Sequence, residues 1–124
     1  MGLLDAVLGN ASEVDVNEVG AELAPILADN ESVTKAYKMV RDLTVFTTKR
    51  LIFIDKQGMT GKKIDYLSIP YKSITTFNIQ TAGRFDTDCE LKIWTSGRDQ
   101  PIELEVAARY AQDMQKSLAN NLFA

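Results

Sequence analysis

Residues 40–63, VRDLTVFTTKRLIFIDKQGMTGKK, contain apolar runs of strand length that are separated by turn residues. The four residues TTKR (47–50) form a tight connection between two of these runs, and the glycine-bearing segment QGMTG (57–61) turns the next pair. Short consecutive connections favour an antiparallel meander, because parallel strands need long crossovers. This stretch therefore predicts successive antiparallel β-strands.

The two-residue alternation of apolar and polar side chains continues on both sides of this stretch. In the segment CELKIWT (89–95), for example, Cys89, Leu91 and Ile93 alternate with polar residues and Trp94, so that one face is apolar and the other is wet. Bounded by turn residues, seven such segments are predicted strands: about 33–41, 43–47, 50–56, 62–69, 74–80, 85–95 and 100–105.

The last part of the chain has helical periodicity. Apolar residues recur there at three- and four-residue spacing: Ala107, Tyr110, Ala111, Met114, Leu118 and Leu122. The predicted fold is mainly β, or α+β by content. It has seven antiparallel strands in two packed sheets and a C-terminal helix that caps them.

The first 31 residues differ from the rest in charge and in periodicity. They hold seven acidic side chains and neither Lys nor Arg, whereas residues 32–72 hold nine basic and three acidic ones. Two short amphipathic helices are predicted in this arm, at residues 3–8 and 19–27, and Asp15 or Asn17 can cap the second. Helices this short need a surface to cover their apolar faces. We therefore divide the chain into an N-terminal helical arm, 1–31, and a domain, 32–124.

Composition excludes several classes of function. His is absent and Cys89 is the single cysteine, which excludes histidine acid–base chemistry, an internal disulfide and a Cys/His zinc site. A net charge of −3 argues against bulk nucleic-acid binding. The acidic row Asp86, Asp88 and Glu90 is interpreted as the solvent-facing side of a strand. We expect no enzyme activity, no metal site and no cofactor.

No run of apolar residues approaches the roughly 18 that a membrane span needs. The first residues, MGLLDAVLGNAS, lack the basic region of a secretory signal. We therefore expect a cytoplasmic protein.

The order of seven strands and one C-terminal helix is that of the pleckstrin-homology (PH) superfold. The segments 40–63, IPYKSI (69–74) and ELKIWTSG (90–97), together with the start MGLLDAVLGNASEVD, closely resemble the bacterial PH domain family in its single-domain version. The resemblance implies a PH-like barrel behind an N-terminal helical arm. It also implies assembly into closed homo-oligomeric rings, with no established biochemical role.

The resemblance does not carry over phosphoinositide binding. Eukaryotic PH domains use a Lys, a variable gap, Lys or Arg, any residue, and Arg around their first hairpin. Here Lys35, Lys38 and Arg41 are spaced by two residues before the arginine, and the acidic Asp42 follows.

The favoured hypothesis is a non-enzymatic binding and assembly module that self-associates into a ring, with an unidentified protein partner as a further expectation. An outward-facing aromatic such as Trp94 often contacts a protein partner. The arm is expected to supply the subunit interface through its apolar residues Leu3, Leu4, Val7, Leu8, Val19, Leu23, Ile26 and Leu27.

The alternative hypothesis is a peripheral membrane or acidic-ligand binder. Its anion surface would consist of basic residues at hairpin ends, and we expect at most weak binding to a membrane surface. A third interpretation of the same charges places the acidic arm of one subunit on the basic sheet of its neighbour. The residues of the predicted anion surface are Lys49, Arg50, Lys56, Lys62 and Lys63.

Overall fold

The computed structural model describes residues 15–39, 42–57, 63–80 and 88–123. The chain divides into two compact units, residues 1–69 and 70–124. The first predicted helix, at residues 3–8, lies outside the described residues, as do residues 58–61 of the predicted turn and parts of three predicted strands, at 40–41, 62 and 85–87.

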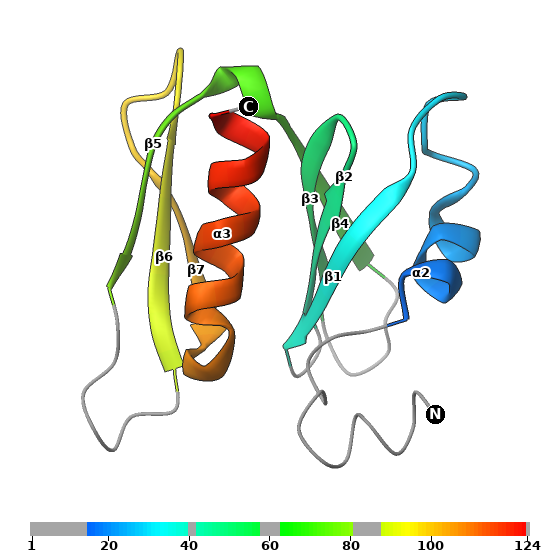
Figure 1. Ribbon diagram of the computed structural model, residues 1–124, viewed down its shortest axis with the longest axis horizontal. Coiled ribbons are helices and arrows are strands. Elements are labelled where there is room, and N and C mark those ends of the chain that lie inside the picture. The colour runs from blue at the N-terminus through cyan, green and yellow to red at the C-terminus, as the bar shows by residue number, and fades with distance from the viewer. Residues whose placement is uncertain (1–14, 40–41, 58–62, 81–87, 124) are drawn as a thin grey trace. The chain divides into compact units, whose positions relative to one another are not determined.

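The first unit contains one helix and a four-stranded antiparallel sheet in the order β1-β2-β3-β4 (Figure 1). The hairpin of β2 and β3 pairs Leu43 with Ile54 and Phe46 with Leu51, so the TTKR segment does form the predicted tight connection. The bounds are α2, Val16–Leu23; β1, Val33–Met39; β2, Asp42–Thr47; β3, Arg50–Gln57; and β4, Lys63–Pro70.

Helix α2 begins and ends for identifiable reasons. The side chain of Asp15 accepts a hydrogen bond from the backbone N–H of Asn17 at 2.9 Å, so Asp15 is the N-cap of the predicted pair. The helix ends at Leu23, two residues before Pro25, whose ring cannot continue a helix. Leu27, which the periodicity placed on the helix, therefore lies beyond it.

The core of the first unit lies between α2 and one face of the sheet. Val19 and Leu23 of the helix are each 3% exposed and pack against Ala36, Val45, Ile52 and Ile54. The opposite face of the same strands is also buried, with Tyr37 packed edge-on against Phe46 at a centroid distance of 6.0 Å. Burial on both faces explains why β2 and β3 appear in the sequence as nearly continuous apolar runs.

The second unit contains a three-stranded antiparallel sheet, β5-β6-β7, and the C-terminal helix. Gly97, at the turn between β6 and β7, has φ +86, which a residue without a Cβ adopts readily. The bounds are β5, Ile74–Gln80; β6, Asp88–Thr95; β7, Ile102–Ala107; and α3, Ala111–Leu122, with short 3-10 turns η2, Tyr71–Ser73, and η3, Ala108–Tyr110.

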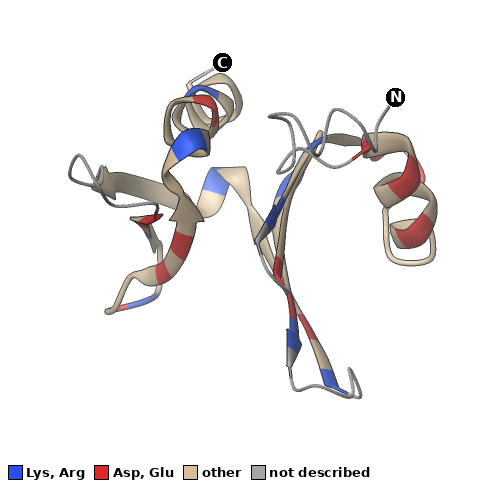
Figure 2. Ribbon diagram, turned by 90° about the horizontal axis from the view of Figure 1, so that it is seen from below, with Lys and Arg blue, Asp and Glu red and all other residues tan. Residues whose placement is uncertain are grey.

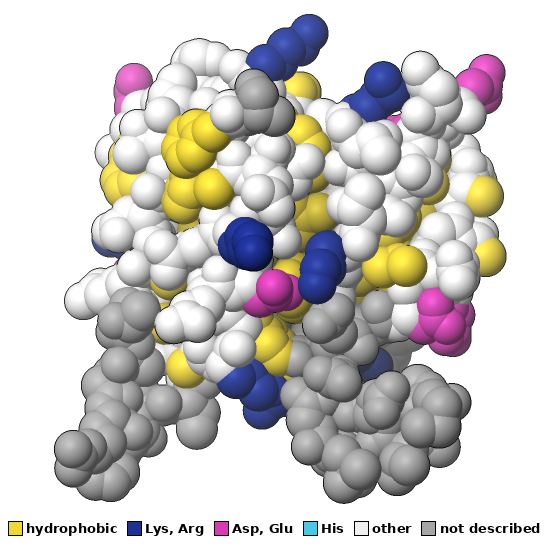
Figure 3. Space-filling model, in the orientation of Figure 1, with side chains coloured by type: hydrophobic (Ala, Val, Ile, Leu, Met, Phe, Trp, Pro, Cys, Tyr) yellow, Lys and Arg dark blue, Asp and Glu magenta, His cyan; other side chains and the backbone are white. Residues whose placement is uncertain are grey.

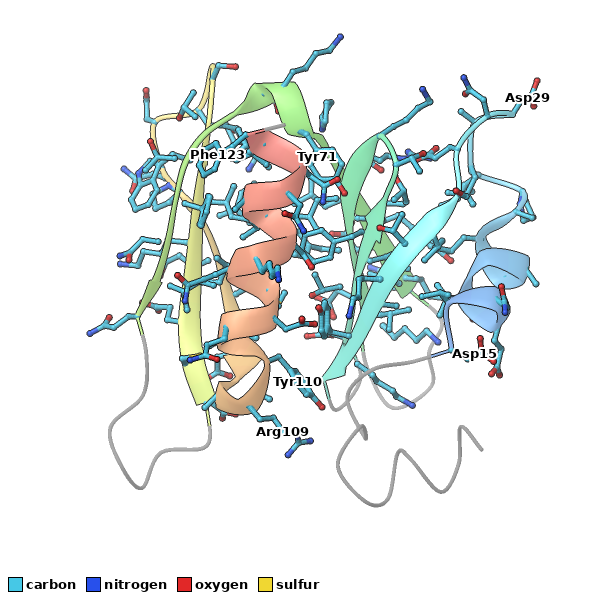
Figure 4. The ribbon with its side chains drawn as sticks, in the orientation of Figure 1. Asp15, Asp29, Tyr71, Arg109, Tyr110 and Phe123 are labelled. Carbon is cyan, nitrogen blue, oxygen red and sulfur yellow. The ribbon has the colours of Figure 1, made fainter. Side chains whose placement is uncertain are left out.

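Helix α3 packs within the second unit against β5 and η2. Its buried side chains include Met114 and Leu118, and Phe123 at its end stacks on Phe77 of β5 at 6.1 Å (Figure 4). The prediction of seven antiparallel strands in two sheets, followed by one helix, is confirmed. The helix starts later than predicted, because Ala107 still belongs to β7.

Candidate functional site

The acidic arm, residues 1–31, and the basic block, as we call residues 32–72, meet within the first unit. Figure 2 shows acidic positions along α2 and basic positions on the sheet that it covers. Among the described residues, Glu31 pairs with Arg50 at 2.9 Å, and Glu22 pairs with Lys56 at 3.9 Å. The second pair is solvent-exposed and contributes little stability. The first is built into the fold.

Arg50 uses both edges of its guanidinium group. Its Nε donates to Glu31 Oε2 at 2.9 Å and its Nη2 to Glu31 Oε1 at 3.1 Å, a two-pronged contact. Nη2 also donates to the carbonyl oxygen of Ile26 at 2.7 Å, and Nη1 to the hydroxyl of Ser68 at 3.0 Å. One arginine at the start of β3 thus connects the end of the arm to β4.

The carboxylate of Glu31 has further partners. The backbone N–H of Ala28 donates to Oε1 at 2.9 Å, and the hydroxyl of Thr47 donates to Oε2 at 2.5 Å. The Thr47 oxygen in turn accepts hydrogen bonds from the backbone N–H groups of Lys49 at 3.0 Å and Arg50 at 2.9 Å. The turn between β2 and β3 is therefore fixed by the same cluster, which we call the Glu31 cluster: Glu31, Thr47 and Arg50.

The ionised form of Glu31 is favoured despite its burial. The side chain is 2% exposed, and this desolvation is the largest single influence and raises the pKa. The hydrogen bonds from Arg50, Thr47 and Ala28, with the charge of Arg50, outweigh it together. The pKa of the Glu31 carboxyl consequently lies below its ordinary value.

The Glu31 cluster is not predicted from the sequence. The opposite charges of the arm and the block were noticed, but they were interpreted as contacts between neighbouring subunits. No pattern links a glutamate to an arginine 19 residues later, since the pair forms only when the hairpin folds beneath the end of the arm.

The structure describes four of the five residues of the predicted anion surface and does not bring these four together. Arg50 is engaged by Glu31, and Lys56 lies near Glu22. Lys49 and Lys63 are exposed, but Lys49 is in the turn before β3 and Lys63 opens β4 at the other end of the sheet. The eight residues of β3 separate these ends by about 23 Å. Lys62 lies outside the described residues, and the anion surface stays a prediction.

The eight residues of the predicted subunit interface fall into three groups. Val19 and Leu23 are buried against the sheet of their own chain, and Leu27 is partly buried beside them. Ile26 is 43% exposed. Leu3, Leu4, Val7 and Leu8 lie outside the described residues. The interface role of the set stays a prediction.

A groove of about 450 Å³ lies beside α2, which we call the α2 groove. Val16 and Gly20 of α2 line it together with Ala24, the C-cap of the helix, and Leu27 and Val33 line it as well. In the space-filling view, hydrophobic side chains reach the surface on this side of the first unit (Figure 3). The polar side chains of Asn17, Asp29 and Ser32 also line the groove, so it presents a mixed polar and apolar surface, which the sequence does not reveal.

Strand β4 carries a second apolar exposure. Ile64 and Tyr66, which point to the same face of the strand, are 41% and 47% exposed. The charged neighbours Lys63 and Asp65 point to the opposite face, so Ile64 and Tyr66 form a small apolar exposure on theirs.

The outward face of β6 is polar, as predicted. Lys92 lies 3.7 Å from Glu90 and opposite Glu103 of β7, and Trp94 is half-buried on the same face. Asp86 lies outside the described residues. Among the residues that the structure describes, no three potential ligands gather as they would around a metal ion.

Cys89 is buried on the inner face of β6, as predicted. Burial raises the pKa of its thiol, and the carboxylate of Asp88 raises it further. The thiol is therefore held in its unreactive protonated form.

Within the described parts of the chain, no helix has the length and apolar character that a membrane span requires.

Comparison with known proteins identifies close relatives. The family model described as Bacterial PH domain matches residues 2–122. The crystal structure of a pleckstrin homology domain from Shewanella amazonensis SB2B is 56% identical, covers 99% of this chain and 100% of its own, and has a TM-score of 0.86. A pleckstrin-homology protein from Shewanella loihica PV-4 is 50% identical over 90% of this chain and 96% of its own, with a TM-score of 0.81. The uncharacterized protein YjqA of Bacillus subtilis strain 168 is 59% identical over 101 residues, 82% of this chain and 81% of its own length.

Proposed function

The chain belongs to the bacterial PH domain family, and from that premise we propose that it is a non-enzymatic, cytoplasmic assembly module that self-associates into a homo-oligomeric ring. Its activity in this proposal is to present a repeated surface to a protein partner. The proposal concerns assembly and binding, because the polar cluster that the fold builds around Glu31 joins parts of the chain to each other.

The anchoring of α2 is the observation that carries the proposal. Val19 and Leu23 fix the helix on the sheet, and the Glu31–Arg50 contact fixes the segment that follows it. The described part of the chain therefore begins at a fixed point, Asp15, which residues 1–14 precede in the sequence (Figure 4). Their apolar stripe, which starts at Leu3, needs a surface to cover it. A neighbouring subunit supplies that surface.

The alternative function, binding of acidic ligands or membranes, receives less support. The arginine of the predicted anion surface, Arg50, is paired with Glu31, and the exposed lysines of that surface lie at two ends of a sheet. Separate lysines give a weak, salt-sensitive attraction to anions and do not form a pocket.

Truncation of the arm tests the proposal. Because α2 contributes to the core, the deletion should stop before Asp15 and remove residues 2–14. We expect sedimentation velocity to show a smaller particle than the full chain, and we expect the far-UV circular dichroism spectrum to keep its β character. An unchanged sedimentation coefficient would remove the arm from the interface.

A further inference from the structure

The α2 groove has the shape that a second helix needs. Val16, Gly20 and Ala24 are spaced by four residues and therefore lie one above the other on the same face of α2. Gly20 leaves the middle of this row open: a Cβ added there would have Cγ2 of Val33, at 4.0 Å, as its nearest contact. Such a hollow receives a large apolar side chain from a packed helix.

The arm contains a stripe of matching period. Leu4 and Leu8 are also four residues apart, and Leu3 and Val7 flank them in the same way. If residues 3–8 form the predicted helix, Leu4 and Leu8 lie one turn apart on its surface. Two adjacent leucines can then enter a groove whose wall repeats at the same interval.

We propose that residues 3–8 of one subunit dock in the α2 groove of a neighbouring subunit. The inference rests on the proposed self-association and specifies where that contact is made. A closed ring needs two different, complementary surfaces on every subunit, and the arm stripe and the groove are such a pair. The connecting residues 9–14 span at most about 20 Å, which is enough to reach an adjoining surface.

Docking onto the groove of the same chain is the rival arrangement, since the same six residues also permit it. Self-docking would cover the stripe and the groove in each subunit. A ring contact would then have to use separate exposed apolar residues such as Ile26 and Tyr66. The proposed ring therefore favours exchange of the arm between subunits, and the experiment separates the two arrangements.

Charge in the groove is compatible with an apolar occupant. Glu31 lines it, but its carboxylate is held by Arg50 and Thr47. Asp29 also lines the groove and is exposed at the end of the loop that follows α2 (Figure 4). The buried carboxylate in the groove, that of Glu31, is therefore paired before any docking.

Filling the groove is the first test. Gly20→Leu places a side chain in the hollow, whereas Ala21→Leu adds the same side chain at an exposed neighbouring position outside the groove. We expect Gly20→Leu to raise the protein concentration at the midpoint of assembly at least roughly tenfold. This is the change in affinity expected when about one apolar side chain is no longer buried in the contact. Ala21→Leu should leave the midpoint unchanged. Equal midpoints for both variants would overturn the inference.

A disulfide test does not depend on how Gly20→Leu folds. In a Cys89→Ala background, Leu4→Cys and Ala24→Cys are combined, the protein is oxidised mildly, and it is run on a non-reducing gel. We expect covalent multimers, because docking between subunits brings the two cysteines of different chains together. Monomers without free thiols would show self-docking, and monomers that keep free thiols would show no docking; either result overturns the inference.

Light scattering on the same oxidised and reduced samples separates this inference from the proposed function. A multimeric mass without covalent multimers contradicts the docking site and leaves self-association standing. A mass of one subunit before and after oxidation contradicts the proposed self-association itself.

Discussion

The carboxylate of Glu31 and the guanidinium of Arg50 lie face to face, with two contacts of 2.9 and 3.1 Å. The glutamate side chain is 2% exposed and the arginine side chain 23%. The pair connects the end of the arm to the hairpin of β2 and β3. It therefore fixes the segment that follows α2, and with it the position of the helix. Its loss should affect stability and assembly together.

Replacement of Arg50 should be strongly destabilising. Arg50→Met keeps the aliphatic part of the side chain but leaves the Glu31 carboxylate buried without its charged partner, and we expect a loss of about 3 kcal/mol in the free energy of unfolding. Arg98→Met, at an exposed position, is the matched control and should change it by less than about 0.5 kcal/mol. Urea unfolding curves measure both. A loss as small as that of the control would mean that the pair does not hold the arm.

The stability of the protein should depend on the ionisation of Glu31 in acid. Its pKa is lower in the folded state than the ordinary value of 4.5, so the unfolded chain takes up the proton first as the pH falls. The stabilisation is complete above the ordinary value and is lost as the pH falls through the folded value. Between pH 5 and 3, wild type should lose more free energy of unfolding than Glu31→Gln does.

Asp65→Asn, at an exposed position of β4, controls for the removal of one carboxylate. Denaturant titrations at several pH values should give this variant the acid dependence of wild type. If Glu31→Gln also follows wild type over this range, Glu31 is not the group responsible.

Thr47 should be needed for its hydroxyl group as well as for its shape. Thr47→Val keeps the β-branched form but leaves the N–H groups of Lys49 and Arg50 without their acceptor, at a cost of about 1–3 kcal/mol. Thr76→Val, on the exposed side of β5, should be nearly neutral. Thermal unfolding followed by circular dichroism compares the two. Equal melting temperatures would argue against a role for the hydroxyl.

The sequence predicted the elements of the fold better than the contacts between them. Apolar runs and turn residues located all seven strands, and Asp15 was one of two predicted caps. Pro25 explains why α2 ends before Leu27, since a helical period continues through a residue that breaks the helix. The pairing of Glu31 with Arg50 could not be predicted, because it depends on how the turn at Thr47 lies beneath the arm.

The α2 groove was beyond prediction for a similar reason. In the sequence, Gly20 is a residue that weakens a helix. Only the structure shows that it leaves space on the helix next to Val33. The predicted anion surface includes residues that the length of one strand separates: Lys49 precedes β3, and Lys56 lies near the end of β3.

Membrane binding should be weak and should not depend on a single pocket. Lys49→Ala and Lys63→Ala act at separate ends of the sheet, so each should reduce co-sedimentation with anionic vesicles at low salt independently of the other. Lys116→Ala, on α3, is the comparison variant. Binding should disappear at physiological salt. Salt-resistant binding that distinguishes one phosphoinositide from another anionic lipid would instead support the alternative function.

The mass of the full chain in solution tests the central claim most directly. Light scattering coupled to size exclusion, at micromolar concentration and physiological salt, should give one species whose mass is a whole multiple of 13.8 kDa and stays constant on dilution within that range. A particle of 13.8 kDa, one subunit, would contradict the account.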